Sequence, residues 1–314
     1  PHFLAVLNTE GDPDGLIRHG NERVLRARFN DARFFWETDQ KIPLKQRVEM
    51  LKAVTFQKDL GSYHAKAERM AALANELSAD LSSAGVKVNR NAVHEAAWLA
   101  KTDLTTELVK EFTELQGIVG GLYAKAQKHA EAVGDAIYDH YKPESMEEEA
   151  PRTSEGAVLS IADKADSIAG MFALGNLPTG SKDPFALRRH ALGVVRILVE
   201  LGLPLELDAL VRQAREQFRD GRIAESVQAE AVSFVLERLR GYLREQGYTA
   251  NEIEAVVSLL PTRIDQVRAR LDAVRAFVKL PEAASLAAAN RRIRNILHKS
   301  APAEDGLFQE SRLA

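Results

Sequence analysis

The apolar residues of this chain recur at steps of three and four, and this spacing constrains the chain to helices more than any other feature does. The clearest example is the apolar stripe of Tyr63, Ala67, Met70, Ala74, Leu77 and Leu81. Residues spaced in this way share one face of an α-helix, which must pack against a neighbour to be covered. A second stripe consists of Val227, Ala231, Val235, Leu239 and Tyr242. The sequence therefore predicts an all-α protein, with at most one short strand near the N-terminus, from Phe3 to Leu7.

Prolines, glycines and capping residues divide the chain into a series of helices. Besides the helix that begins near Tyr63 and ends at Gly85, the expected helices cover residues 22–38, 43–58, 92–101, 104–112, 121–141, 156–174, 184–201, 207–220, 224–245, 250–259, 263–278 and 281–298. The run of Gly202, Leu203 and Pro204 predicts one domain boundary. The expected parts are residues 1–41, 42–203, 204–260 and 261–314.

The composition excludes several kinds of chemistry. The chain has no cysteine, so it has no disulfides, thiolate metal sites or thiol nucleophiles, which fits a reducing cytosol. No apolar run reaches the roughly 18 residues that a membrane-spanning helix requires. The net charge of −3 gives no general attraction for nucleic acid, but residues 261–301 carry nine cations against three anions. A basic face of this kind can follow a phosphate backbone or can be an ordinary solvated helix surface.

A turn and a helix start are combined with cations at residues 179–189. Gly180 allows a tight bend, Asp183 is a good helix cap, and Pro184 suits the first position of a helix. Lys182, Arg188 and Arg189 then supply donors for a phosphate, or simply a solvated surface. Residues 175–182 come close to the nucleotide-binding pattern G-x-x-x-x-G-K-[ST]. The Lys and Ser are reversed, however, and a helix precedes them, so an ATP site of that kind is excluded.

Three aspartates of the first helical part are candidate ligands for a divalent cation. Asp103 follows an expected helix, and Asp163 and Asp166 lie one turn apart on another. The alternative is that they cap helices or pair with Lys101 and Lys164. None of the eight histidines forms an H-E-x-x-H motif or a His-Asp pair, so the imidazoles that zinc or iron hydrolases need are not grouped. His64 and His94 are near enough to Asp103 in sequence to be considered as ligands.

Several long motifs, which occur in order along the chain, resemble the β subunit of the bacterial tetrameric glycyl-tRNA synthetase. They lie at residues 20–28, 31–35, 101–107, 111–117, 161–166, 178–196 and 287–296. The resemblance runs from Phe3 to about Lys299. It implies that the chain, which starts at Pro1 without a Met, is the middle-to-late part of a protein roughly twice as long.

The resemblance also implies a fold and a division of labour. Residues 42–203 would be an HD-type helical domain, preceded by the end of an upstream domain, and residues 261–314 would begin a helical anticodon-binding domain. Glycine activation, with ATP and Mg, belongs to the α subunit of a heterotetramer of two α and two β chains. The β subunit mainly holds tRNA(Gly). The fragment alone is expected to be inactive, cytoplasmic and without catalytic residues, cofactor or membrane contact of its own.

Active HD-type proteins bind metal through a His, a His-Asp pair and a later Asp. Here Thr102 and Asp103 stand where the His-Asp pair would be, Asp163 matches the later Asp, and His64 is the nearest candidate for the first His. The resemblance therefore implies a degenerate site without metal. A metal-dependent HD-type phosphohydrolase and a purely structural docking module remain alternatives. The residues expected to contact tRNA are Lys182, Arg188, Arg189, Arg291, Arg292, Arg294 and Lys299, with Lys101 and Lys164 as further candidates.

Overall fold

The computed structural model describes residues 2–218 and 225–300, without the side chains of 225 and 297–300. Within these ranges it has fourteen α-helices, four short 3-10 helices and one two-stranded antiparallel sheet, so the predicted all-α fold is confirmed. The α-helices are α1 (Leu16–Asp39), α2 (Leu44–Met50), α3 (Tyr63–Ser83), α4 (Arg90–Leu99), α5 (Glu107–Glu111), α6 (Ile118–Ala126), α7 (Glu131–Asp139), α8 (Ser154–Ala173), α9 (Leu187–Glu200), α10 (Leu207–Glu216), α11 (Glu225–Glu245), α12 (Ala250–Val257), α13 (Val267–Val278) and α14 (Ala283–Ser300). The other elements are η1 (Leu51–Ala53), η2 (Thr102–Thr105), η3 (Thr113–Leu115), η4 (Ile264–Gln266), β1 (Thr55–Gln57) and β2 (Gly61–Ser62).

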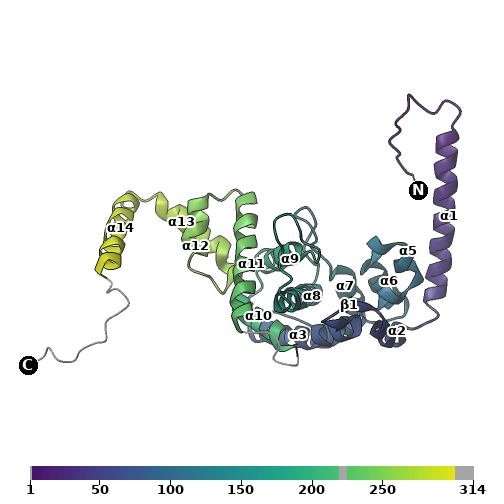
Figure 1. Ribbon diagram of the computed structural model, residues 1–314, viewed down its shortest axis with the longest axis horizontal. Coiled ribbons are helices and arrows are strands. Elements are labelled where there is room, and N and C mark those ends of the chain that lie inside the picture. The colour runs from purple at the N-terminus through teal and green to yellow at the C-terminus, as the bar shows by residue number, and fades with distance from the viewer. Residues whose placement is uncertain (1, 219–224, 301–314) are drawn as a thin grey trace, which may run out of the picture.

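Helix α8 lies at the centre of the molecule (Figure 1). Every residue from Gly156 to Phe172 is buried, because α8 contacts α3, α4, α7, α9, α10 and α11. Close packing requires small residues along it: a Cβ at Gly170 would lie 2.7 Å from Leu60 Cδ1. One apolar core extends through these helices, and α10 and α11, which follow the expected boundary near Leu203, pack against α8 and α9 within it.

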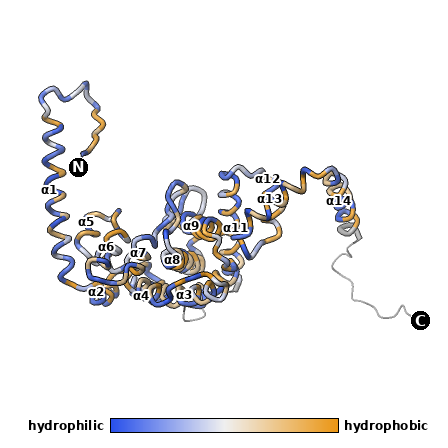
Figure 2. The backbone as a smooth tube through the Cα atoms, turned by 180° about the vertical axis from the view of Figure 1, so that it is seen from behind, coloured by the Kyte–Doolittle hydropathy of each residue, from blue (hydrophilic) through white to orange (hydrophobic). Residues whose placement is uncertain are grey.

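The first and last helices, α1 and α14, project from opposite sides of this body (Figure 1). In α1 Asp39 is the buried residue, and in the described side chains of α14 it is Ala283. Both helices carry exposed apolar residues among polar ones, as Figure 2 shows. These include Phe29 and Phe34 on α1 and Leu286 and Ile293 on α14.

Asp39 attaches α1 to the body. Its carboxylate accepts hydrogen bonds from the backbone N–H groups of Glu107 and Leu108, both at 3.0 Å, and so caps α5. Arg47 Nη2 lies 3.1 Å from the same carboxylate, and the ion pair is almost completely buried. The last residue of the largely exposed α1 is therefore held in the body by buried hydrogen bonds and an ion pair.

Some expected elements are corrected by the structure. The segment from Phe3 to Leu7 is not a strand; the described sheet is the short hairpin of β1 and β2. The helix expected at 43–58 ends earlier, because Thr55 and Phe56 favour the strand that pairs with β2. The helix expected at 121–141 is two helices, since Lys128 has φ 62° and interrupts the helical backbone. Among the described helices, none is both long and apolar enough to cross a membrane.

Candidate functional site

Asp163 lies in the middle of α8 and binds two buried lysines. Its Oδ1 is 2.9 Å from Nζ of Lys66 on α3, and its Oδ2 is 2.7 Å from Nζ of Lys101, just after α4. Burial by itself raises the pKa of the Asp163 carboxyl, but the two ammonium groups outweigh burial and hold this pKa well below its usual value. Both carboxylate oxygens are therefore charged and already engaged by cations.

Asp166, the next carboxylate along α8, is paired in the same way. Its Oδ2 is 2.9 Å from Nζ of Lys66, and its Oδ1 is 2.6 Å from Nε of Arg69. Lys66 also donates to the Ser167 hydroxyl at 2.9 Å. Two cations three residues apart on α3 thus meet two aspartates three residues apart on α8. This buried charge cluster (Lys66, Arg69, Lys101, Asp163 and Asp166) connects α3 and the end of α4 to the central helix.

Asp103 has a different role, because it caps a helix. Its Oδ2 accepts hydrogen bonds from the backbone N–H groups of Gly117 at 2.6 Å and Gly120 at 3.2 Å, at the start of α6. The fit is tight, since a Cβ at Gly120 would lie 3.0 Å from this oxygen. Burial raises the pKa of the Asp103 carboxyl to about 6, despite the opposing bond from Gly117. The expectation that the aspartates serve as caps and ion-pair partners is therefore confirmed for Asp103 and Asp163.

His64, the third residue expected at the degenerate metal centre, contacts neither aspartate. Its ring nitrogens lie 3.7 Å from Glu49 and 3.9 Å from Glu68, and its ring packs edge-on against Trp98. Within the described residues, no group of three His, Asp or Glu side chains has a geometry that could hold a metal ion. The carboxylates of Asp103 and Asp163 instead accept from backbone amides and from lysines.

His140, which the sequence analysis did not single out, lies beside this cluster. Its Nε2 is 2.9 Å from Nζ of Lys101, and its Nδ1 is 2.5 Å from the carbonyl oxygen of Ile137. Burial, together with the nearby Lys101 charge, lowers the pKa of His140 well below its usual value, so the ring is neutral. A neutral ring that donates from Nδ1 accepts from the lysine at Nε2.

Lys164 is buried on the other side of α8. Its ammonium donates to the carbonyl oxygens of Tyr141 at 2.8 Å and Lys142 at 3.1 Å, and to the Ser160 hydroxyl at 2.7 Å. Burial lowers the pKa of Lys164 to about 8. Lys164 therefore fixes the chain after α7 to α8 and pairs with no carboxylate of the described residues, contrary to one of the expected roles.

The expectation that Lys101 and Lys164 contact RNA is therefore wrong. Each is at most 3% exposed, so neither presents its ammonium to a phosphate at the surface. The partners that the sequence analysis missed are Lys66, Arg69 and His140. A signal for Lys66 was present: it lies between Tyr63 and Met70 at steps of three and four, on the face of α3 that the apolar stripe marks as buried.

A second group of cations, separate from the buried charge cluster, lies at the turn formed by residues 179–189. Asp183 caps α9, as its carboxylate accepts from the backbone N–H groups of Leu187 at 2.8 Å and Arg188 at 2.9 Å. The expected cap is confirmed, but the helix begins at Leu187 rather than at Pro184, because Ala186 has φ 52°. The first two amides of α9 are therefore occupied, and side chains are the main donors left for a phosphate at this place.

Lys182, Arg188 and Arg189 supply such side chains. Lys182 pairs with Thr179 in an isolated antiparallel bridge, and both Lys182 and Arg189 are exposed. Arg188 is half-buried and lines a surface cavity of about 570 Å³ between α9 and α11. In the part of the chain that the structure describes, none of the three cationic groups is engaged by a hydrogen bond or ion pair. We refer to these three residues as the turn cations.

The basic region near the C-terminus divides into two kinds of residue. On and before α13, Arg263 pairs with Asp265 and Arg275 with Glu252, each at 2.7 Å. On α14, Arg291, Arg292 and Arg294 are exposed and enter no ion pair among the described residues. Lys299 belongs to the last turn of α14, but its side chain lies outside the described part. Figure 1 shows α14 well separated from α9, so the free cations form two surfaces.

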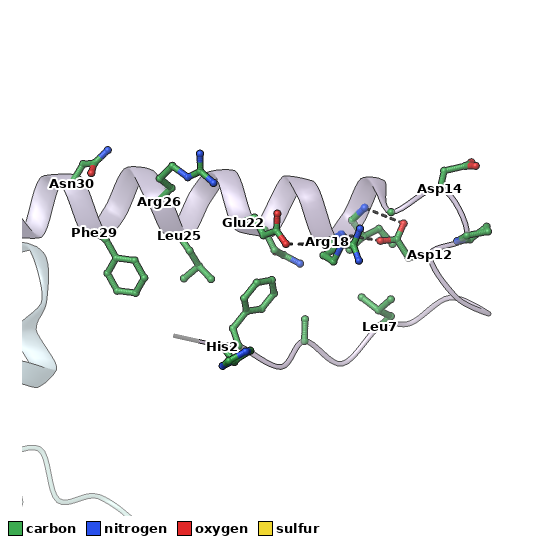
Figure 3. Close-up of a pocket in the computed structure, with 16 residues that line it drawn as sticks. His2, Leu7, Asp12, Asp14, Arg18, Glu22, Leu25, Arg26, Phe29 and Asn30 are labelled. Carbon is green, nitrogen blue, oxygen red and sulfur yellow. Dashed lines mark hydrogen bonds and ion pairs between the residues drawn. The ribbon is translucent and has the colours of Figure 1, made fainter.

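A further cavity, of about 970 Å³, lies between the N-terminal segment and α1. Figure 3 shows Leu25 and Phe29 of α1 directed toward the extended segment that carries His2 and Leu7. The ion pair of Arg18 and Glu22, at 3.9 Å, lies along the same side of the helix. An open and mainly apolar surface of this kind is typical of packing between protein segments rather than of a reaction centre.

The chain is similar in sequence to proteins of one family. A family profile described as "Glycyl-tRNA synthetase beta subunit" matches residues 1–258. The chain is 51% identical over 314 residues to a glycine–tRNA ligase β subunit from Acidobacterium capsulatum, covering 98% of this chain and 44% of that protein. It is 48% identical over 299 residues to the corresponding protein of Polaromonas naphthalenivorans, covering 95% and 41%. The chain spans less than half the length of these relatives. It belongs to the glycyl-tRNA synthetase β-subunit family.

Proposed function

We propose that this chain is the part of a glycine–tRNA ligase β subunit that holds tRNA(Gly) while a separate α subunit activates glycine. The observation that supports this most is the contrast between its charged groups. Asp163 and Asp166 are paired with cations on both oxygens and Asp103 Oδ2 accepts from backbone amides, whereas the side chains of the turn cations have no hydrogen-bond or ion-pair partner among the described residues. Cations placed in this way can neutralise phosphates and position an RNA without reading its sequence.

The finer parts of the proposal follow from membership of the family. The α subunit would use ATP and Mg, two α and two β chains would assemble, and the complex would work in the cytoplasm. The part from residue 42 to residue 203 would be an HD-type domain whose metal ligands have been replaced. Lys66 and Lys101 support this, because their ammonium groups lie against both oxygens of Asp163. Arg291, Arg292 and Arg294 would form a second phosphate-binding surface.

The experiment that tests the proposal is aminoacylation of tRNA(Gly) by the complex of full-length α and β subunits. We expect Arg188→Ala/Arg189→Ala to raise the KM for tRNA roughly tenfold or more, since each charge-assisted bond is worth about 1.5–3 kcal/mol. The KM for glycine and for ATP is expected to stay unchanged.

A matched control removes two cations at the far end of α8. Lys87 and Arg90 lie beside Asn89, whose N–H donates to Glu155 in the first turn of α8. The turn cations follow the last turn of the same helix, about 30 Å away along its 20 residues. If Lys87→Ala/Arg90→Ala raises the KM for tRNA as much as the Arg188/Arg189 double variant does, the turn cations are not a specific tRNA surface.

A further inference from the structure

The cavity beside Arg188 has walls from four elements. They are the end of α8 (Phe172), the following loop (Leu177 and Pro178), the start of α9 (Arg188) and one side of α11 (Glu230, Ser233, Phe234, Glu237 and Arg238). It is open to solvent, and its volume of about 570 Å³ is sufficient for one nucleobase with its ribose.

Two aromatic rings form the apolar wall of the cavity. The ring centroids of Phe172 and Phe234 are 5.2 Å apart, with 58° between the ring planes. Phe172 is almost fully buried, whereas Phe234 is half-buried, with the guanidinium carbon of Arg238 over its ring at 5.8 Å from the centroid. Since every base has a π-face, a partly exposed ring in a cavity is a common means of holding an unstacked base.

Several polar groups in the wall of the cavity lack a hydrogen-bond or ion-pair partner among the described residues. Arg238 donates from Nη2 to Glu237 at 2.7 Å, but its Nε is buried without a hydrogen-bond partner. The guanidinium of Arg188 and the carboxylate of Glu230 enter no ion pair among the described residues. Buried donors are normally satisfied, so the Nε of Arg238 is a donor in this wall that is available to an acceptor on a ligand.

The distribution of charge around the cavity indicates where the base and the phosphate of such a ligand would lie. Arg188 and Arg238 are balanced by Glu230 and Glu237, so the cavity itself has little net charge. Lys182 and Arg189, which have no counter-charge, are exposed outside it. A phosphate is therefore favoured at the rim and a neutral base inside, which is the arrangement of one nucleotide of a longer strand.

We propose that this cavity receives a single unstacked nucleotide of the bound RNA. The base lies against Phe234, and the phosphates that flank it meet Arg188 and the exposed Lys182 and Arg189. The carboxylate of Glu230 accepts a hydrogen bond from the exocyclic amine of adenine, cytosine or guanine, a group that uracil lacks. This inference rests on the proposed tRNA-holding function and adds to it the chemical class of the subsite.

Binding of short single strands to the full-length α–β complex tests the subsite. The probes are fluorescently labelled five-nucleotide oligoadenylate and oligouridylate, with AMP as an unlabelled competitor. We expect oligoadenylate to bind more tightly than oligouridylate. Phe234→Ala is expected to weaken oligoadenylate binding by about 5- to 150-fold, the range for one stacked base, without changing the slope of log Kd against log salt. Arg188→Ala is expected to lower that slope by about 0.7.

A second variant guards against a folding defect in Phe234→Ala. Ser233 is exposed on α11 and lines the cavity, so Ser233→Trp fills the space without altering the packed face of the helix. It is expected to weaken oligoadenylate binding as strongly, with the thermal midpoint of the complex unchanged. Lys87→Ala/Arg90→Ala is the control and is expected to bind like the wild type.

Each other result has a definite meaning. If both cavity variants bind oligoadenylate normally while Arg188→Ala/Arg189→Ala weakens tRNA binding, the subsite is wrong and the proposed function stands. If the Arg188/Arg189 variant also binds tRNA normally, the proposed function fails at this surface. Displacement of oligoadenylate by AMP at equal concentration would assign the cavity to a free nucleotide. Loss of α–β assembly in Ser233→Trp, with normal RNA binding, would assign it to a protein segment.

Discussion

The body of the protein and the turn before α9 both carry lysine and arginine side chains, but these side chains have different environments and roles. Lys66 and Lys101 are buried against Asp163, while Lys182 and Arg189 are exposed and have no counter-ion within residues 2–218 and 225–300. A buried ammonium must be paired, because leaving a charge unpaired inside a protein is costly. The comparison teaches that the environment of a lysine, rather than its presence in a basic motif, decides whether it is available to a phosphate.

Among the variants that test this comparison, removal of Asp163 is expected to lower the free energy of unfolding the most. Asp163→Ala leaves Lys66 and Lys101 with fewer partners in the core, and breaking a buried pair in this way costs about 3–5 kcal/mol. Chemical denaturation of the full-length β subunit measures the loss. As a control, Glu216→Ala removes an exposed pair with Arg212 and is expected to cost under about 1 kcal/mol. Equal losses in the two variants would mean that the buried cluster is not what holds α3 to α8.

A matched pair of lysine variants sharpens the comparison. Lys101→Met removes a buried ammonium and is expected to lower the free energy of unfolding by about 2–3 kcal/mol, because His140 and Asp163 both lose a partner. Lys182→Met removes an exposed ammonium and is expected to change it by less than about 0.5 kcal/mol. The same denaturation experiment reads both values, and a reversed order would contradict the assignment of roles.

Asp103 gives a pH-dependent test of the buried region. Its pKa is raised to about 6 in the folded protein from 3.8, so between these values the folded state binds more protons than the unfolded state. The contribution of this group to stability therefore decreases as the pH rises from about 4 to about 6, by roughly 2–3 kcal/mol. Asp103→Asn removes the titration. We expect the stability of this variant relative to the wild type to improve by that amount between pH 4 and pH 7, whereas a difference that does not vary with pH would contradict the prediction.

From the sequence, the helices could be predicted better than the burial and the partners of individual charged side chains. Helical periodicity and caps gave the helices, and even the role of Asp183 as a cap was predicted, since these features depend on neighbours along the chain. The burial of Lys101 and Lys164 was not predicted, because it depends on α8 meeting the end of α4, some 60 residues away, and the chain after α7, about 20 residues away. The split between α6 and α7 was also missed, since it depends on one residue, Lys128, at positive φ.

The smallest expected effect concerns α14. Arg291→Ala/Arg292→Ala is expected to leave the free energy of unfolding within about 0.5 kcal/mol of the wild type, because both residues are exposed and unpaired among the described residues. If the second basic surface contributes to tRNA binding, the slope of log Kd against log salt falls by up to about 1.8 for two lost phosphate contacts. An unchanged slope would restrict RNA binding to the turn before α9.

The most direct test of the division between buried and exposed cations is the salt dependence of tRNA(Gly) binding to the α–β complex with Arg188→Ala/Arg189→Ala in the β subunit. The account predicts weaker binding, a slope of log Kd against log salt that is lower by about 1.8, and an unaltered unfolding midpoint. Wild-type affinity together with a wild-type slope would contradict it.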